Sequence, residues 1–501
     1  MSTNIWPCDT RRDADGNLTF HGITARELLA QFGSPLYVID VDDVRSRARK
    51  FVHTAATAFP NTTTHVSFAA KAFLSKEIAR IVSDEGMLID TCTLGEMKIA
   101  LAAGIPGRHL VLHGNNKSDE EIELAIREHF NKIVIDEPQE PARIAAIAER
   151  LGMRARVMVR VTSGIHAGGH EFVSTAHEDQ KFGIALLPIN SPGENDTEEP
   201  FSTIFSADHG GSSIDEDGTR DEAHLRALMT VMDTVAHGPA MDVIRTVRGF
   251  DAQLELVGVH SHIGSNIHDA DAFIQAAQRM MLLRKTCYAT EGYVLPEVDL
   301  GGGYSVAYTE HEDSMDLAVE LGRLADAITS ANAVLGMPMP SISFEPGRWI
   351  IAPTGVTLYT VGTVKPVALS NAMDSSGNPI IQRLYVSVDG GMSDNIRPAL
   401  YGSEYAAVLA NREYSGPCEV ARVVGKHCES GDIVVQDVEL PADIHRGDIL
   451  AVPVTGAYGR TMASNYNQAL IPAVVAVGNK GAHLMMRRQT IDDLLSYDVS
   501  E

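Results

Sequence analysis

The stretch at residues 64–84, THVSFAAKAFLSKEIARIVSD, contains a change of pattern that decides the fold. Its first six residues have the composition of a short strand, whereas apolar residues recur at helical spacing after residue 71. Lys71 therefore stands where a strand gives way to a helix. A lysine at such a junction has two interpretations. Its stem packs on apolar surface while its ammonium group reaches water, or its amine takes part in chemistry.

Similar junctions recur along the chain up to about residue 345. The predicted strands are THVSFA, MLIDT, HLVLHG, KIVID, RARVMVRV, LELVGVH, EVDLG and SISFE. Amphipathic helical patterns lie between them, such as SDEEIELAIREH and EPARIAAIAERLG, with suitable helix starts at Ser, Asp or Pro. Alternating strands and helices build a parallel sheet, and eight such units close a (β/α)8 barrel. The predicted fold class is therefore α/β, with a TIM-type barrel.

The chain changes character after residue 350, where β-rich segments are separated by Gly and Pro. This pattern predicts a second, all-β C-terminal domain, a barrel or sandwich, which also takes the N-terminal strand PLYVID at 35–40. The expected organisation is an N-terminal segment at 1–45, a barrel at 46–345 and a β domain at 346–501. Residues 188–250 resist the barrel pattern. Their acidic first half, rich in Gly and Ser, predicts a mobile surface insertion before the helix-like DEAHLRALMTVMDTV.

Composition excludes several classes of protein. The 501 residues carry a formal charge of −25, with 66 acidic against 41 basic residues, so a nucleic-acid partner is not expected. The five cysteines form no CxxC pair, which argues against a disulfide framework or a structural zinc site. No segment approaches the roughly 18 uncharged apolar residues of a membrane helix, and the N-terminus lacks a signal-peptide core. We therefore expect a cytoplasmic protein without a membrane partner.

Polar residues collect at the predicted strand ends. In a parallel barrel, functional groups gather at the carboxyl ends of the strands because the loops there share one mouth. Those ends carry Lys71, Asp90, His113, HSHIGSN at 260–266, DLGGGY at 299–304 and FEPGR at 344–348. We expect these groups to form one cluster.

Two of these motifs allow more than one interpretation. The glycines at 301–303 expose backbone N–H groups that would cradle a phosphate, or they form a tight turn after a buried strand. His260 and His262 alternate along a strand end, so both side chains point into the mouth. Such a pair binds a metal ion, packs as ordinary hydrogen-bonded histidine, or stacks an imidazole on a flat aromatic cofactor.

Taken together, the strand-end groups match the binding needs of pyridoxal 5′-phosphate. Lys71 is able to form a Schiff base, the glycines suit a phosphate, and Glu345 is the candidate partner of a ring nitrogen. A carboxylate that holds the pyridine nitrogen protonated turns the ring into an electron sink for a carbanion on the substrate.

The C-terminal region supplies three further motifs, DGGMSDNIRPALYG at 389–402, GKHCESGD at 425–432 and TGAYGRTMASNYN at 455–467. Arg397 and Tyr401, four residues apart, suit a substrate carboxylate. Cys428 is either an ordinary buried cysteine or a reactive thiol. Because its acidic neighbour does not favour the thiolate, it fits a proton donor better than a nucleophile.

From about residue 20 to 497 the chain carries a set of motifs in a recognisable order: FAAKA, KSDEE, HEFVSTAHEDQKFG, HSHIGS, DLGGG, EPGR, DGGMSDNIRPALYG, VVGKHCESGD and GAYGRTMASNYN. In these motifs it resembles the alanine-racemase-like (fold type III) pyridoxal-phosphate decarboxylases, and within them the members that act on diaminopimelate. The resemblance implies a carboxy-lyase that removes CO2 from the D-configured carbon of meso-2,6-diaminopimelate. The product is L-lysine, so the reaction is the last step of lysine biosynthesis.

The resemblance also implies roles for individual residues. Lys71 corresponds to the Schiff-base lysine, His262 to the residue stacked on the ring, and Glu345 to the pyridine-nitrogen partner. The full cofactor set is Lys71, Asp90, His262, Ser265, Gly302, Gly303, Glu345, Arg348 and Tyr458, and the substrate set is Arg348, Arg397, Tyr401, Glu429 and Tyr458. Cys428 corresponds to a proton donor that reaches in from the second subunit of a homodimer with composite active sites. No metal ion is expected.

Other functions remain open at this point. Decarboxylases of ornithine, arginine or a carboxylated polyamine are the alternatives within the class, although Arg348, Arg397 and Glu429 together suit a zwitterionic distal end. From other classes come a metal-dependent barrel hydrolase built on His260 and His262, and a non-catalytic regulatory homologue. Retention of both Lys71 and Cys428 speaks against the regulatory homologue.

Overall fold

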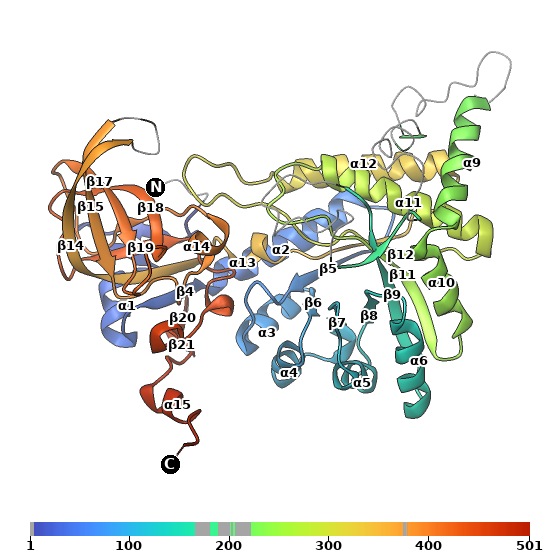
Figure 1. The fold of residues 1–501 in the computed structure, drawn as a ribbon, viewed down its shortest axis with the longest axis horizontal. Coiled ribbons are helices and arrows are strands. Elements are labelled where there is room, and N and C mark those ends of the chain that lie inside the picture. The colour runs from blue at the N-terminus through green and yellow to red at the C-terminus, as the bar shows by residue number, and fades with distance from the viewer. Residues whose placement is uncertain are drawn as a thin grey trace.

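The protein folds into a barrel and a β-rich domain that lie side by side (Figure 1). The structure is a computed structural model, and it describes residues 5–165, 181–188, 201, 204–205, 222–373, 377 and 379–500. Among these residues no helix is both long and apolar enough to cross a membrane.

The barrel is a closed ring of eight parallel strands, as predicted. They are β5 (Thr64–Ala69), β6 (Leu88–Thr91), β7 (Leu110–Leu112), β8 (Lys132–Ile135), β9 (Ala155–Thr162), β11 (Leu254–His260), β12 (Glu297–Asp299) and β13 (Ser341–Phe344). They follow one another round the ring in chain order, and β13 pairs with β5 to complete it. Their short Val-, Ile- and Leu-rich runs suit strands buried on both faces. A further short strand, β10 (Ile184–Ala185), pairs in parallel with the end of β9 and was not predicted.

Helices surround the barrel strands. They are α2 (Val41–Ala58), α3 (Lys76–Asp84), α4 (Leu94–Ala102), α5 (Asp119–Arg127), α6 (Glu140–Leu151), α9 (Glu222–Ala236), α10 (Pro239–Gly249), α11 (Asp271–Glu291), α12 (Leu317–Leu335), α13 (Arg348–Ile351) and the 3-10 turn η1 (Gly107–His109). The predicted helix starts are confirmed where a cap is visible. Ser118 forms a capping box with Glu121 before α5, and Pro141 lies in the first turn of α6.

The predicted insertion is only partly described. The helix predicted over DEAHLRALMTVMDTV is confirmed as α9, whereas α10, which follows it, was not predicted. Most of its first half, predicted to be a mobile surface segment, lies outside the described residues, as do residues 166–180 with most of the HEFVSTAHEDQKFG motif.

The β-rich domain is built around one large sheet in the order β18-β17-β15-β14-β4-β20-β21. Its strands are β4 (Leu36–Asp40), β14 (Gly355–Met373), β15 (Pro379–Val388), β16 (Val408–Leu409), β17 (Cys418–Val424), β18 (Ile433–Pro441), β19 (Ile449–Pro453), β20 (Ala473–Gly478) and β21 (Gly481–Met486). The N-terminal strand β4 lies antiparallel to β14 and parallel to β20, which confirms that PLYVID joins this domain. The strand β19 joins β14 and β16 off the main path.

Several small elements accompany this domain. They are the three-stranded sheet β1 (Thr10–Arg12), β2 (Leu18–Phe20) and β3 (Ile23–Thr24), the helices α1 (Ala25–Phe32), α14 (Arg397–Tyr401) and α15 (Ile491–Leu495), and the 3-10 turns η3 (Arg460–Met462) and η4 (Tyr466–Gln468). The sequence predicted none of β1, β2, β3, β16 and β21. These strands are short or carry no clear alternation of apolar and polar residues.

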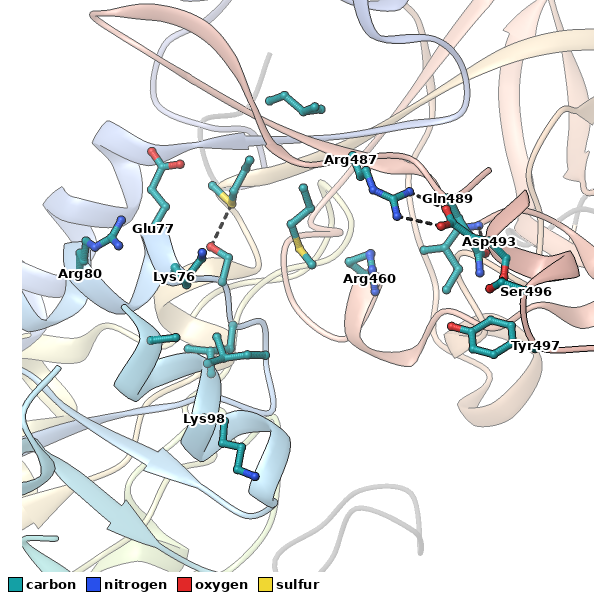
Figure 2. A pocket seen from close by; sticks show the side chains of 18 residues that line it. Lys76, Glu77, Arg80, Lys98, Arg460, Arg487, Gln489, Asp493, Ser496 and Tyr497 are labelled. Atoms are coloured by element: carbon teal, nitrogen blue, oxygen red, sulfur yellow. Dashed lines mark hydrogen bonds and ion pairs between the residues drawn. The ribbon is translucent and has the colours of Figure 1, made fainter. Parts of the chain in front are cut away.

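A groove of about 890 Å³ separates α3 and α4 of the barrel from β21 and α15 of the β-rich domain (Figure 2). Lys76, Arg80 and Lys98 line the barrel side, while Arg487 on the opposite side is paired with Asp493 at 2.5 Å. Arg460 faces the groove between them. The large groove is separate from the strand-end cluster described below, although its lining residue Leu74 lies three positions from Lys71.

Candidate active site

The turn that carries Lys71 joins β5 to α3 and is held by a loop of the β-rich domain. The backbone N–H of Tyr458 donates to the carbonyl of Ala72 at 2.9 Å, and the Thr461 hydroxyl donates to the same oxygen at 3.2 Å. Tyr458 adopts a left-handed conformation (φ 58°), which a non-glycine residue takes at an energetic cost. Lys71 itself remains exposed on this turn. The two domains therefore meet at the lysine.

The glycines at 301–303 pack where a side chain has no space. A Cβ atom on Gly302 would lie 2.3 Å from the carbonyl oxygen of Glu345, and one on Gly303 would lie 2.5 Å from that of Gly264. Gly301 and Gly303 also have φ values of 69° and 120°. A small pocket opens beside them, lined by Ala69, Lys71, His262, Ser265, Gly302, Gly303, Tyr304, Glu345, Gly347, Arg348 and Tyr458. The three motifs at residues 260–266, 299–304 and 344–348 thus meet at one site, as predicted.

His262 lies against the glycine turn, and its Nδ1 accepts a hydrogen bond from the N–H of Gly302 at 3.2 Å. Burial holds the pKa of His262 well below its ordinary value, and the nearby positive charges of Lys71 and Arg160 add to this effect. The imidazole is therefore neutral at physiological pH. A neutral ring that lines the pocket is suited to stacking on a flat cofactor.

The side chain of Glu345 is 11% exposed, and its carboxylate is shared by two histidines. Its Oε1 lies 3.0 Å from Nε2 of His113 and its Oε2 lies 3.3 Å from Nε2 of His260. Burial alone would raise the pKa of Glu345, but His113 and His260 hold it well below its ordinary value. Burial likewise opposes the charge on His113, yet Glu345 and Asp90 raise the pKa of His113 to about 9. Glu345 is therefore an anion and His113 a cation at neutral pH.

Asp90 lies beside this group on β6. Both of its carboxylate oxygens are buried without a hydrogen-bond partner, and the nearest ionic neighbour is Nε2 of His113 at 3.7 Å. Burial and the negative charge of Glu345 raise the pKa of Asp90 to about 7. Asp90 therefore holds a proton more readily than an exposed aspartate does, and its unsatisfied oxygens lie beside His113 and Glu345 rather than in an apolar core.

The HxH motif does not bring His260 and His262 together as metal ligands. Among the described residues the group able to offer three ligand atoms is His113, His260 and Glu345, whose atoms lie within 4.8 Å of one another. His262 instead contacts the glycine turn through Nδ1. The hydrolase interpretation based on the two motif histidines was therefore wrong in its ligand set.

Two buried arginines lie beside Tyr458, and one of them, Arg348, lines the pocket. Arg348 donates through Nη2 to the Ser265 hydroxyl at 2.9 Å, and Arg397 donates through Nη2 to the Ser403 hydroxyl at 3.1 Å. Their guanidinium carbons lie 4.9 Å and 5.6 Å from the ring centre of Tyr458, and Arg397 also lies 5.5 Å from the ring of Tyr401. The two arginines, predicted from separate motifs, therefore both pack against the ring of Tyr458.

Cys428 and Glu429 lie apart from this pocket, on an exposed loop between β17 and β18. The loop is fixed at its base, where Asp432 accepts the backbone N–H groups of His427 at 2.8 Å and Met392 at 2.6 Å. The Glu429 carboxylate accepts a hydrogen bond from the Tyr466 hydroxyl at 3.3 Å. Neither Cys428 nor Glu429 lines the pocket that holds Lys71 in the same chain.

Sequence reasoning missed two tyrosines of the site, Tyr308 and Tyr405. The Tyr308 hydroxyl accepts a hydrogen bond from Nη1 of Arg348, and the Tyr405 hydroxyl accepts one from Nε of Arg397 at 2.9 Å. Neither tyrosine lies at a barrel strand end or within the motifs that marked the site. The partners of Glu345 were also missed, although His113 and His260 were visible as strand-end residues.

These residues fit pyridoxal phosphate. The turn of glycines that tolerates no Cβ suits a phosphate, the anion Glu345 suits a protonated ring nitrogen, and Lys71 supplies the amine for an aldehyde. The fold and the site therefore define the class of pyridoxal-phosphate-dependent barrel enzymes. The sequence profile of the family described as "Pyridoxal-dependent decarboxylase, pyridoxal binding domain" matches residues 42–244 and 219–352.

Relatives that align with the whole chain identify the family within this class. The diaminopimelate decarboxylase of Mycobacterium tuberculosis is 41% identical, with 100% of this chain and 98% of the relative covered. That of Bacillus subtilis is 33% identical, with 98% and 97% covered. The chain therefore belongs to the diaminopimelate decarboxylase family of pyridoxal-phosphate-dependent enzymes.

Solved structures agree with this assignment. The diaminopimelate decarboxylase of M. jannaschii in complex with L-lysine superposes with a TM-score of 0.79 at 26% identity, covering 100% of this chain and 99% of that one. The Helicobacter pylori enzyme, also complexed with L-lysine, gives a TM-score of 0.71 at 27% identity, covering 94% and 98%.

Proposed function

We propose that this enzyme converts meso-2,6-diaminopimelate into L-lysine and CO2, as the last step of lysine biosynthesis. One observation carries the choice of substrate. Arg348 and Arg397 are 7% and 6% exposed, and in the described part of the chain every side-chain hydrogen-bond partner of their guanidinium groups is a hydroxyl. Buried cations require an anionic partner. A phosphate and a second carboxylate provide the negative charge that the protein itself does not.

The roles of individual residues follow from their positions. Lys71 would hold the aldehyde carbon of the cofactor, and Glu345 would hold its ring nitrogen. Ser265, Gly302, Gly303 and Tyr458 would surround its phosphate together with Arg348, while His262 would cover one face of the ring and Asp90 would lie near its nitrogen edge. When bound, the cofactor accepts the electron pair that is left when the bond to the departing CO2 breaks.

The distal end of the substrate would be held by charged groups of both signs. Arg397, Tyr401 and Arg348 would bind the carboxylate that stays on the product, and Glu429 would bind the adjacent ammonium group. A proton must then replace CO2 at the D-configured carbon, and Cys428 is the proposed donor. Ornithine has no distal carboxylate, so an ornithine decarboxylase would leave the second arginine without a partner.

The position of Cys428 supports a homodimer. Cys428 and Glu429 are exposed and do not line the pocket of their own chain, but the loop that carries them is anchored firmly by Asp432. We propose that this loop enters the site of a second subunit, and that each site is composite. The five free cysteines fit a reducing compartment, and we propose the cytoplasm as the location.

The test is a stereochemical assay of the purified enzyme with pyridoxal phosphate. The meso, LL and DD isomers of diaminopimelate and L-ornithine are supplied separately, and CO2 and L-lysine are measured. We expect equal amounts of CO2 and L-lysine from the meso isomer, and little turnover of LL-diaminopimelate or ornithine. Preferred turnover of ornithine would replace the proposed substrate. Absence of CO2 from every substrate would contradict the proposal.

A further inference from the structure

The two buried arginines of the site are connected through one tyrosine. Tyr308 follows β12 in the chain and is 5% exposed. Its hydroxyl accepts a hydrogen bond from Nη1 of Arg348, and the guanidinium carbon of Arg397 lies 5.4 Å from the centre of its ring. The guanidinium carbon of Arg348 also lies 5.7 Å from the ring centre, so Tyr308 contacts Arg348 through its hydroxyl and both arginines through its ring.

A second tyrosine completes the arrangement from the β-rich domain. The ring of Tyr405 meets that of Tyr308 edge to face at 5.2 Å, with an interplanar angle of 82°. Its hydroxyl accepts from Nε of Arg397 at 2.9 Å. Burial raises the pKa of Tyr405 to about 12, although Arg397 acts in the opposite direction, so Tyr405 stays protonated. Both guanidinium groups are thus fixed by neutral partners, which leave their positive charge uncompensated.

Neutral partners serve a binding site better than carboxylates here. A carboxylate in place of either tyrosine would pair with the arginine and compete with an incoming anion. A tyrosine hydroxyl fixes the direction of the planar guanidinium group without neutralising it, and the ring face adds a cation–π contact. The hydroxyl of Tyr308 accepts from Arg348, so its own hydrogen points away from that arginine. Among the described residues Arg348 is the only hydrogen-bond partner of this hydroxyl, which leaves its O–H able to donate to an oxygen of a ligand.

We propose that Tyr308 is a positioning residue for substrate selection: it holds Arg348 and Arg397 at the spacing that recognises the distal carboxylate of the substrate. The inference rests on the proposed function. It extends the proposed function by naming a residue that lets the enzyme distinguish a diamino diacid from a simple diamine. Tyr308 does not take part in bond breaking or proton transfer.

The test compares two inhibitors that differ only in the recognised group. L-lysine keeps the distal carboxylate, whereas 1,5-diaminopentane (cadaverine) lacks it. The Tyr308→Phe variant keeps the ring and loses the hydroxyl. Because a hydrogen bond to a charged group is lost, we expect the KM for meso-diaminopimelate and the inhibition constant of L-lysine to rise about tenfold or more. The inhibition constant of cadaverine and kcat should stay within about twofold of wild type.

A control variant and a cofactor titration make the result specific. Tyr293→Phe removes a tyrosine hydroxyl that donates to the carbonyl of Leu256 at 2.7 Å, outside the pocket, and should change none of these constants. The dissociation constant of pyridoxal phosphate is measured for Tyr308→Phe by absorbance. An unchanged value is expected. A loss confined to the cofactor would show that the hydroxyl serves the phosphate, and it would overturn the inference.

Two other outcomes would also overturn it. Equal weakening of L-lysine and cadaverine would indicate a general structural role for Tyr308. A Tyr308→Phe variant that behaves like wild type, in an enzyme that turns over meso-diaminopimelate, would remove Tyr308 from selection and leave the proposed function standing. Failure of the wild-type enzyme to turn over meso-diaminopimelate would instead remove the proposed function, and this inference with it.

Discussion

Glu345 is held in its charged form by its surroundings before any cofactor is present. His113 and His260 each contact one of its oxygens, and the opposite charge of His113 offsets the cost of burying the carboxylate. A ring nitrogen that binds here finds an anion already in place. The same ion pair makes the stability of the cofactor-free protein depend on pH.

His113 should produce a measurable loss of stability in mild alkali. Its pKa is raised from 6.5 to about 9 in the folded protein, so the folded state keeps a proton that the unfolded chain has released. The stabilisation is complete below pH 6.5 and is lost as the pH rises through about 9. Asp90, with a pKa raised to about 7, acts in the same direction at lower pH. We expect the unfolding temperature of cofactor-free protein to fall between pH 6.5 and 9, and His113→Asn to flatten this fall.

The control for this measurement is His53→Asn, because His53 is exposed on α2. This variant should retain the pH dependence of the wild type. Thermal unfolding followed by circular dichroism at pH 6, 7.5 and 9 gives the comparison. A slope in His113→Asn equal to that of the wild type would show that other groups carry it.

The loops after β11, β12 and β13 form one interlocked unit through their backbones. The N–H of Glu345 donates to the carbonyl of Gly301 at 2.8 Å, and the N–H of Ile267 donates to that of Gly303 at 2.8 Å. No side chain is needed for these bonds, and no side chain fits between the loops at Gly302 or Gly303. The shape of the glycine turn that would bind the phosphate therefore depends on the close approach of these backbones.

Gly303→Ala should weaken cofactor binding strongly. The added Cβ would lie 2.5 Å from the carbonyl oxygen of Gly264 at a φ of 120°, so the loops must separate. We expect the dissociation constant of pyridoxal phosphate to rise at least about tenfold, because strain of roughly 1–2 kcal/mol adds to the displaced loop. The matched control is Gly292→Ala, with a φ of 65° at the end of α11 and open space around the Cβ position. It should lower stability but leave cofactor affinity unchanged, and equal affinities in the two variants would contradict this account.

The barrel strands were predictable because each is a short apolar run followed by a polar or glycine-rich end. The same rule found Lys71, His262 and Glu345, since strand ends share one mouth. It could not find Tyr308 or Tyr405, because these residues reach the arginines from loops whose course depends on the packed domains. The strand-end rule also did not predict which charged side chains pair with each other. His260 was visible in the sequence, but its contact with Glu345 depends on the register of β11 and β13 around the barrel.

The complete molecule places the chemical groups of one chain in two separate locations. Lys71 lies where the two domains meet, whereas Cys428 is exposed on a loop outside that pocket. If the second subunit supplies Cys428, two inactive variants should restore each other. A mixed dimer of Lys71→Ala and Cys428→Ala subunits contains one site with both defects and one site with neither.

We expect each homodimer to be severely impaired and the exchanged mixture to recover roughly a quarter of wild-type activity per site, since about half of randomly paired dimers are mixed. Wild-type enzyme taken through the same exchange procedure controls for losses, and differently tagged subunits report the extent of exchange. Proven exchange without recovered activity would place Lys71 and Cys428 in the same subunit's site.

The position of β4 in the large sheet also affects how the chain folds while the ribosome synthesises it. β4 pairs with β14 on one side and β20 on the other, yet the whole barrel is synthesised between β4 and its first partner. All five residues of this strand are buried in the finished protein. At a synthesis rate of roughly 5–20 residues per second, β4 leaves the ribosome on the order of tens of seconds before Gly355 and the rest of β14 are made. The nascent chain therefore carries an unpaired, apolar segment with high β-propensity while the barrel is synthesised. During this time the segment is able to aggregate or to bind a chaperone. Residues 355–500 expressed alone would lack the strand that joins the two halves of their sheet.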